Sequence, residues 1–298
     1  MNKILLIGGN GFLGNNLKEH ANGIEFDAPR SSQLNFLTKE GFENYSQGYD
    51  TVIYMAADYG GLKYNIDNRL KMMFSNTEMT TNFFHFVEKL RPKRIITFGS
   101  ACAYPANKSL MKEEEIYDGA VHPSVNEYGN IKRMLVWGSK TFEKELGIEW
   151  DHLSLANMYG PYDVYDLDRS HIVGALITKF MMSGESVQLM GTGVAKRDLI
   201  YVGDVCEAIL KVINSKPSNK VINVGSGDSM LIKDLVDIIH SLTDPDKKIK
   251  WGTPDENGSL EKSLDITRAQ HLLKWSPRTS LKDGLDKTLA WYKESLKQ

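Results

Sequence analysis

A glycine-rich turn close to the N-terminus constrains the fold more than any other feature of this chain. Residues 3–7 form a mostly apolar run that predicts a buried strand, and residues 8–14 continue as Gly-Gly-Asn-Gly-Phe-Leu-Gly. Such a turn lets a pyrophosphate approach the backbone N–H groups at the start of a helix, here near Phe12. We therefore expect a dinucleotide site, the alternative being a plain tight turn. The residues expected to contact the dinucleotide here are Gly8, Asn10, Gly11, Phe12, Leu13 and Gly14.

The end of the predicted second strand, residues 23–27, bears on which dinucleotide is bound. An acidic residue at this strand end holds the ribose hydroxyls of NAD, whereas arginine and serine nearby suit the 2′-phosphate of NADP. Asp27 and Arg30 therefore indicate opposite cofactors. Because Arg30 and Ser31 stand together in the following loop, we expect NADPH, with NADH as the alternative.

Two further strands point to the same edge of a sheet. Residues 51–56 predict a strand that ends in Ala56 and Ala57, whose small side chains let the backbone pass close to a cofactor. Residues 94–98 predict a buried strand that ends next to Ser100. Ligands of open α/β sheets bind at the carboxyl ends of the strands.

A tyrosine and a lysine lie one turn apart on a helix predicted over residues 126–146. Tyr128 and Lys132 share one face of that helix. A lysine cation lowers the pKa of a nearby phenol, which can then exchange a proton with a carbonyl or alcohol oxygen. Ser100 can hold the same oxygen, so the three groups suit hydride chemistry at a C–O centre. A solvated surface pair is the alternative, since Tyr-x-x-x-Lys is common by chance.

The order of predicted elements indicates an α/β fold. Strands alternate with helices, which predicts a Rossmann-type, doubly wound parallel sheet with right-handed crossovers. The second half of the chain predicts a smaller, interleaved α/β lobe. We expect residues 1–158 plus about 197–216 to form the dinucleotide-binding domain, and about 159–196 plus 217–298 to form the substrate lobe.

Composition excludes several classes of partner. The chain has 298 residues and a net charge of −2, which offers no electrostatic reason to bind nucleic acid or an anionic membrane. No apolar run approaches the about 20 residues of a membrane span, and the N-terminus resembles no signal peptide. Cys102 and Cys206 have no paired spacing, so we expect no disulfide framework and no metal site. A cytoplasmic location is the expectation.

These residues together resemble the extended short-chain dehydrogenases/reductases of the nucleotide-sugar type, and among them the GDP-L-fucose synthase family. Residues 56–61, Ala-Ala-Asp-Tyr-Gly-Gly, are similar to its Ala-Ala-x-x-Gly-Gly segment. Residues 99–105, Gly-Ser-Ala-Cys-Ala-Tyr-Pro, are similar to its Gly-Ser-Ser-Cys-Ile-Tyr-Pro. Residues 170–173, Ser-His-Ile-Val, are similar to its Ser-His-Val-Ile.

The resemblance implies reduction of a GDP-4-keto-6-deoxy sugar together with epimerisation at C3 and C5. Tyr128 would then be the general acid of the reduction, and Lys132 would orient it and the nicotinamide ribose. Ser100 would bind the keto oxygen. Cys102 and His171 would be the base and the acid of the epimerisation.

The resemblance also implies contacts with the ligands and with a second copy of the chain. Gly61 and Asn157 would contact the substrate, and Arg197 would pair with its diphosphate or sugar. Asn157 and His171 would also contact the cofactor. A homodimer would form through a four-helix bundle of the helices expected at residues 65–90 and 126–146.

Departures from the family pattern keep other functions open. Ala101 replaces a serine, and Asn10 and Phe12 stand where the family commonly has arginine and methionine. One alternative is a reductase without epimerisation that acts on another nucleotide 4-keto sugar, such as a GDP-6-deoxy-heptose. Others are a nucleotide-sugar 4-epimerase that retains NAD and a non-catalytic Rossmann cofactor sensor.

Overall fold

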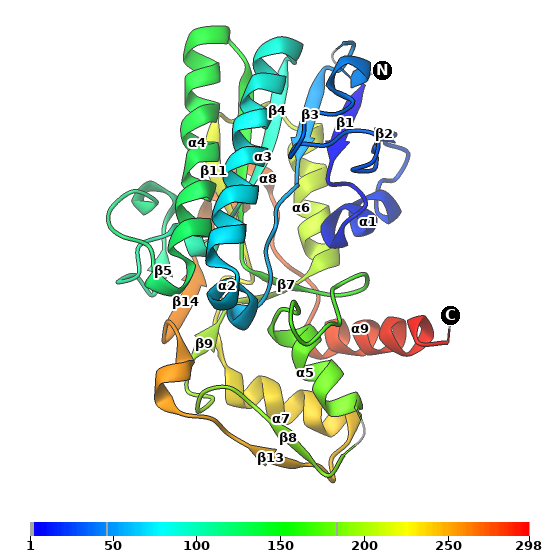
Figure 1. Cartoon of the computed structure of the whole chain (residues 1–298), viewed down its shortest axis with the longest axis vertical. Helices are drawn as coiled ribbons and strands as arrows, with labels where there is room; N and C mark the ends of the chain where they lie inside the picture. The colour runs from blue at the N-terminus through cyan, green and yellow to red at the C-terminus, as the bar shows by residue number, and fades with distance from the viewer. Residues whose placement is uncertain (1–2, 46, 183, 298) are drawn as a thin grey trace.

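A six-stranded parallel sheet forms the centre of the molecule (Figure 1). The computed structural model describes residues 3–45, 47–182 and 184–297. The strands run in the order β11-β6-β4-β3-β1-β2. Their bounds are β1 Ile4–Ile7, β2 Phe26–Asp27, β3 Thr51–Tyr54, β4 Arg94–Ser100, β6 Glu149–Leu155 and β11 Lys220–Val224. The doubly wound α/β fold predicted from the sequence is confirmed.

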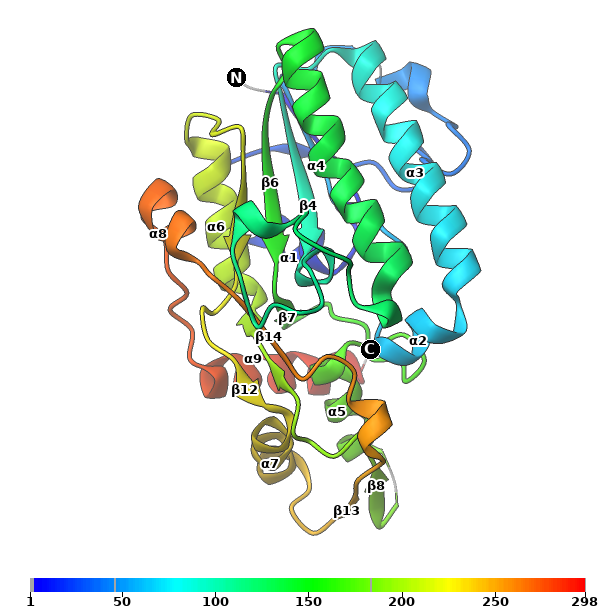
Figure 2. The ribbon, with the colours of Figure 1, turned by 90° about the vertical axis from the view of Figure 1, so that its left-hand side faces the viewer.

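Helices cover both faces of this sheet, which explains why its strands are apolar on both sides. The helices α3 (Arg69–Leu90) and α4 (Asn126–Leu146) lie on one face. On the opposite face lie α1 (Phe12–Glu19), α6 (Val202–Asn214) and α8 (Thr267–Leu273). Figure 2 shows the sheet edge-on between these two layers.

A smaller lobe lies beyond the carboxyl ends of the sheet strands (Figures 1 and 2). Its own apolar cluster is built by α5 (Ile172–Met181), α7 (Ile232–Thr243) and α9 (Leu281–Ser295). Two short strand pairs complete it: β7 (Asn157–Tyr159) with β10 (Leu199–Tyr201), and β8 (Ser186–Gln188) with β13 (Lys248–Lys250). A small four-stranded sheet adds the strands β12 (Met230–Leu231), β9 (Lys196–Arg197), β14 (Glu261–Leu264) and β5 (Leu110–Met111), in that order. In the part of the chain that the structure describes, 3₁₀ turns span Phe42–Tyr45, Ala101–Ala103, Glu113–Glu115, Pro123–Val125 and Pro254–Asn257.

Three predicted elements differ from the structure, and one of them is the strand expected over residues 51–56, which ends at Tyr54. The helix expected over residues 65–90 forms as two helices, α2 (Leu62–Asp67) and α3. Asn68 lies between them, and its side-chain amide donates a hydrogen bond to the Tyr64 carbonyl at 3.0 Å. The strand expected over residues 23–27 shortens to β2, since Gly23 has a φ of +88°.

The expected domain limits also need a correction at residue 217. Strand β11 was expected in the lobe, yet it pairs with β6 in the large sheet, and α8 packs against it. Helix α5 ends at Met181. Within the described ranges, no helix is long and apolar enough to cross a membrane.

Candidate active site

The glycine turn between β1 and α1 is packed so closely that it needs its glycines. Gly8 has a φ of +81°, and a Cβ there would lie 2.8 Å from the Ala56 nitrogen. A Cβ on Gly14 would lie 2.4 Å from the Gly9 Cα. Gly11 caps α1 without a side-chain hydrogen bond, so the first-turn N–H groups remain available to an anion. The turn therefore fits the pyrophosphate of a dinucleotide.

Asn10 ties this turn to the loop that follows β2. Its side-chain amide donates to the carbonyl oxygens of Ala28 at 3.2 Å and Pro29 at 3.3 Å. The Lys18 ammonium donates to the Asn10 side-chain oxygen at 3.2 Å. A cation thus stands beside the loop that was expected to select the cofactor.

The acidic residue of that loop already has a partner. The Tyr49 hydroxyl donates a hydrogen bond to the Asp27 carboxylate, and burial together with this carboxylate raises the pKa of Tyr49. Arg30 and Ser31 are exposed. Positive and hydroxyl groups are therefore free to face a ligand here, whereas one carboxylate oxygen of Asp27 is engaged.

The end of β4 brings a hydroxyl and a thiol together. Ser100 is the last residue of the strand, and its Oγ accepts a hydrogen bond from the backbone N–H of Cys102 at 3.2 Å. This bond caps the short 3₁₀ turn of residues 101–103 and so fixes the position of the thiol relative to the serine.

Tyr128 and Lys132 lie in the first turns of α4 and are both buried. The Lys132 ammonium lies 5.2 Å from the centre of the Tyr128 ring. Burial lowers the pKa of Lys132 to about 8. Burial, followed by negative charge on Cys102 and Tyr54, raises the pKa of Tyr128. In the protein without ligands, the pKa of the phenol thus moves in the direction opposite to the lowering expected from Lys132, and burial is the main cause.

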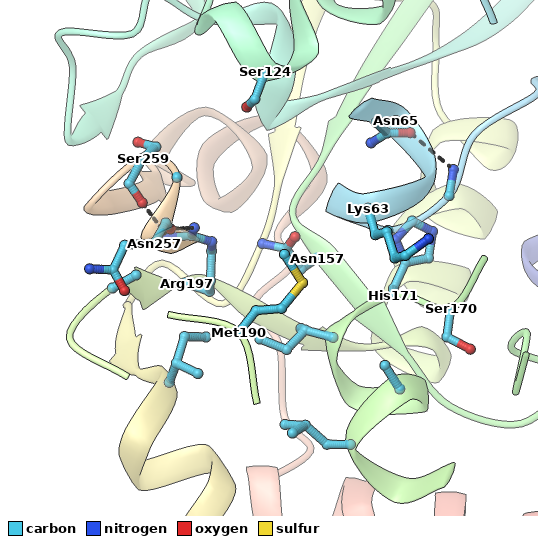
Figure 3. Close-up of a pocket in the computed structure, with 18 of the residues that line it drawn as sticks. Lys63, Asn65, Ser124, Asn157, Ser170, His171, Met190, Arg197, Asn257 and Ser259 are labelled. Atoms are coloured by element: carbon cyan, nitrogen blue, oxygen red, sulfur yellow. Dashed lines mark hydrogen bonds between the residues drawn. The ribbon is translucent and has the colours of Figure 1, made fainter. Parts of the chain in front are cut away.

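A cavity of about 300 Å³ lies between the sheet edge and the lobe. Six residues predicted to bind substrate or to act in catalysis line it: Gly61, Ser100, Cys102, Asn157, His171 and Arg197. In Figure 3, Arg197 and His171 stand on opposite sides with Asn157 between them. Tyr128 lies behind the cavity wall, where Tyr59 covers one face of its ring.

His171 and Asn157 are held by the starts of lobe elements. His171 is the N-cap of α5, and burial lowers the pKa of its imidazole to about 4. The ring is therefore neutral at neutral pH. Asn157 begins β7, and its side-chain amide donates to the Asp198 carbonyl at 3.0 Å.

The Arg197 guanidinium is held by main-chain carbonyl groups. It donates to Lys196 at 2.8 Å, to Ser259 at 2.7 Å and to Asn257 at 3.2 Å. Burial lowers its pKa, while negative charge on Cys102 opposes that shift. With no carboxylate among these partners, the cation keeps its charge for an anionic ligand.

Tyr59 is the site residue that the sequence analysis missed. It occupies a variable position of the Ala-Ala-x-x-Gly-Gly segment, and nothing in the local pattern assigns it a contact. Other residues that line the cavity without having been predicted include Lys63, Asn65, Ser124, Met190, Asn257 and Lys262. No cluster of three or more potential metal ligands occurs within residues 3–45, 47–182 and 184–297.

The glycine turn lies at the carboxyl edge of a doubly wound sheet, and Ser100, Tyr128 and Lys132 surround the end of β4. This arrangement defines a short-chain dehydrogenase/reductase fold. The chain belongs to the NAD dependent epimerase/dehydratase family, whose model matches residues 4–225. The match spans the large sheet as far as the end of β11.

Individual relatives are similar over nearly the whole chain. GDP-L-fucose synthase of Escherichia coli (strain K12) is 25% identical over 312 residues, which cover 98% of this chain and 97% of that protein. A GDP-6-OMe-4-keto-L-xylo-heptose reductase from C. jejuni superposes with a TM-score of 0.89 at 21% identity, covering 99% of this chain and 98% of that one. A GDP-mannoheptose C4 reductase from Campylobacter jejuni with NADP bound gives 0.84 at 21% identity, covering 98% of both chains.

Proposed function

We propose that this protein reduces a GDP-linked 4-keto-6-deoxy sugar with NADPH and inverts the sugar at C3 and C5. The observation that carries the proposal is the convergence of Ser100, Cys102 and His171 on one cavity, with Tyr128 directly behind its wall. The similarity to the Escherichia coli GDP-L-fucose synthase supports the same reaction.

Reduction uses the groups at the end of β4 and the start of α4. The cofactor supplies a hydride when bound. Ser100 holds the C4 oxygen by donating a hydrogen bond, and Tyr128 delivers the proton that completes the alcohol. Lys132 orients the phenol from one turn further along the helix.

Epimerisation uses Cys102 and His171, which line the same cavity. The C4 ketone acidifies the protons on C3 and C5. One of these two groups removes one of these protons, and the other returns a proton from the opposite face. The resemblance implies that the Cys102 thiolate is the base and His171 the acid. In either direction Cys102 passes through its thiolate form.

The remaining walls of the cavity suit the other parts of such a substrate. Arg197 offers a carbonyl-held guanidinium to the diphosphate. Gly61 and Asn157 line the same cavity and would contact the sugar, and Asn157 and His171 would also contact the cofactor.

NADPH is favoured over NADH by the loop after β2. The Asp27 carboxylate is bonded by Tyr49, while Arg30 is exposed and Lys18 stands nearby. A 2′-phosphate is best recognised by such cations. The structural neighbour that holds NADP supports this choice.

A second candidate is reduction without inversion on a GDP-linked heptose. The fold similarity to the C. jejuni heptose reductase, with a TM-score of 0.89, favours it. The same Ser100, Tyr128 and Lys132 would act, and Cys102 and His171 would then only contact the sugar.

The partner we propose besides the substrate is a second copy of the chain. Leu70 and Phe74 on α3 and Trp137 on α4 are exposed by 68%, 64% and 68%. Helices α3 and α4 pack side by side on the same face of the sheet. A four-helix bundle made with the same pair from another copy would cover these side chains.

Turnover of GDP-4-keto-6-deoxymannose in deuterated water tests the proposal, with NADPH and NADH compared and the sugar product examined by NMR. Cofactor oxidation with deuterium at C3 and C5 is the expected result. Oxidation without that label would favour the heptose reductase candidate. No oxidation of either cofactor with this sugar or with a GDP-4-keto-heptose would contradict both.

A further inference from the structure

Tyr59 touches three of the residues to which the proposed function gives a role. Its ring stacks on Tyr128 with the ring centres 4.0 Å apart and the planes 17° apart. Its ring centre lies 5.2 Å from that of His171. Its hydroxyl lies 3.4 Å from the Cys102 sulfur, within hydrogen-bond distance. It therefore stands between the reducing and the epimerising groups.

The loop that carries Tyr59 is anchored on both sides, so the position of the ring is fixed. Asp58 accepts hydrogen bonds from the Tyr64 hydroxyl at 2.8 Å and from Arg169 at 3.2 Å. The Gly61 N–H donates to the Arg169 carbonyl at 3.0 Å. These contacts join the loop to α2 and to the segment that leads into His171.

In the contact between Tyr59 and Cys102, the protonation states of the two groups decide which atom donates the hydrogen bond. Burial, followed by negative charge on Cys102, raises the pKa of Tyr59 well above its usual value. The phenol therefore keeps its proton at neutral pH. A thiolate can only accept hydrogen bonds, so once Cys102 is ionised the bond must run from the Tyr59 O–H to the sulfur. A hydrogen bond to an ionised partner is about twice as strong as one between neutral groups.

We propose that Tyr59 is a positioning residue for Cys102, whose hydroxyl stabilises the thiolate through which Cys102 passes during proton transfer. The inference rests on the proposed epimerisation for its purpose, but the contact itself can be tested without substrate. Removing the hydroxyl makes the thiolate harder to form, whereas the ring of Tyr59 continues to support Tyr128.

Other groups near the sulfur also affect the ionisation of the Cys102 thiol, so the test variant must retain them. They are the Arg197 guanidinium, which favours the thiolate, the neutral Tyr128 phenol and, across the cavity, the neutral His171 imidazole. Tyr59→Phe retains all three of these side chains and the stacked ring, because it removes a single oxygen.

The experiment is the pH dependence of alkylation by iodoacetamide of the intact protein without ligands. Cys206 is fully buried in α6, so Cys102 is the thiol expected to react, and Cys102→Ser supplies the blank. Tyr165→Phe is the matched control, because it removes a phenol oxygen that bonds the Gly160 carbonyl at 3.2 Å, away from the residues that line the cavity. A thermal melt checks that each variant is folded.

We expect the midpoint of the alkylation profile to move up by about 1 to 2 pH units in Tyr59→Phe and to stay in place in Tyr165→Phe. A midpoint that is unchanged or lower in Tyr59→Phe overturns the inference. Deuterium exchange at C3 and C5 should fall by a factor of about 10 to 100 in Tyr59→Phe, with a smaller change in the reduction rate. If the wild-type protein shows no exchange, the epimerisation fails, while the alkylation profile still decides the role of Tyr59.

Discussion

At the scale of single residues, burial sets the protonation states of the candidate active site. His171 has its pKa lowered to about 4 and Lys132 to about 8, both by desolvation. Tyr59 and Tyr128 have theirs raised for the same reason. At neutral pH the His171 imidazole and the Tyr59 and Tyr128 phenols are therefore neutral, whereas Lys132 still carries its proton for most of the time.

Replacing the thiol should separate the two halves of the proposed reaction. Cys102→Ser removes the only thiol in the cavity wall among the described residues, so deuterium exchange at C3 and C5 should fall by a factor of about 10² to 10⁴. Reduction should persist on a 4-keto sugar that needs no inversion. Cys206→Ala, in the core of α6, is the control and should leave the ratio of exchange to reduction unchanged. Equal loss of both activities in Cys102→Ser would contradict the division of labour.

Lys132 should make stability depend on pH in the alkaline range. Its pKa falls from 10.5 in the unfolded chain to about 8 in the folded protein. Between these values the unfolded chain holds the proton and the folded protein does not, so this side chain's contribution to the free energy of unfolding rises with pH. Urea unfolding at about pH 7 and about pH 10 should therefore show wild-type protein gaining stability relative to Lys132→Met. A variant at an exposed lysine, Lys144→Met, should show no such trend. If the free energy of unfolding of wild-type protein falls relative to that of Lys132→Met between the two pH values, the lowered pKa of Lys132 is refuted.

At the scale of elements, the site depends on loops that follow the carboxyl ends of the strands and are joined to one another by hydrogen bonds. The loop after β3 carries Tyr59 and is bonded to the segment before α5 that carries His171. The turn after β1 is bonded through Asn10 to the loop after β2. A change in one loop should therefore be felt at a residue carried by another.

Gly61 offers the sharpest test of this coupling between loops. Its φ of −64° suits any residue, but a Cβ there would lie 2.2 Å from the Ser170 carbonyl oxygen. Gly61→Ala should therefore push the two loops apart, lower the free energy of unfolding by about 1 to 3 kcal/mol and reduce turnover. At Gly119, another loop glycine, the nearest atom to an added Cβ is 3.4 Å away. Urea unfolding of Gly119→Ala should match wild type, and an equally stable Gly61→Ala would show that the loops adjust freely.

Arg30 should select the cofactor through the loop after β2. If its guanidinium faces a 2′-phosphate, Arg30→Ala should weaken NADPH binding by about tenfold and leave NADH binding unchanged. Fluorescence titration with each cofactor measures the ratio. Arg278→Ala, at an arginine with a 76% exposed side chain, is the control. Equal weakening of both cofactors by Arg30→Ala would argue against recognition of the 2′-phosphate.

At the scale of the whole molecule, one large sheet and one small lobe enclose the cavity. We propose that residues 1–158 and about 197–216, together with β11 and α8, form the nucleotide-binding domain, and that the other segments form the substrate lobe. The chain passes between the two several times, which ties the position of Arg197 to that of Ser100.

The oligomeric state should depend on the exposed face of α3 and α4. Trp137→Glu places a charge where the proposed four-helix bundle would bury an indole, so the protein should become monomeric at micromolar concentration. Light scattering after size exclusion measures the mass. Leu260→Glu, at a leucine that is 63% exposed in the lobe, should leave the mass unchanged. A wild-type monomer, or a Trp137→Glu dimer, would contradict the proposal.

The sequence by itself determined the features that depend on neighbours along the chain. The strand before the glycine turn, the helix over residues 126–146 and the spacing of Tyr128 and Lys132 all follow from periodicity and from glycine geometry. Cys102 and His171 came from short motifs that resemble a known family, and the structure brings both to one cavity.

Only the tertiary structure decided the contacts and protonation states that depend on packing. Tyr59 and Cys102 are in contact although they lie 43 positions apart in the sequence, and a local sequence pattern cannot predict such a contact. The pKa of Tyr128 moves in the direction opposite to that expected from Lys132, because desolvation arises from all surrounding elements at once. Strand β11 joins the large sheet because an open edge of β6 is available to it in space, which the order of elements along the chain does not express.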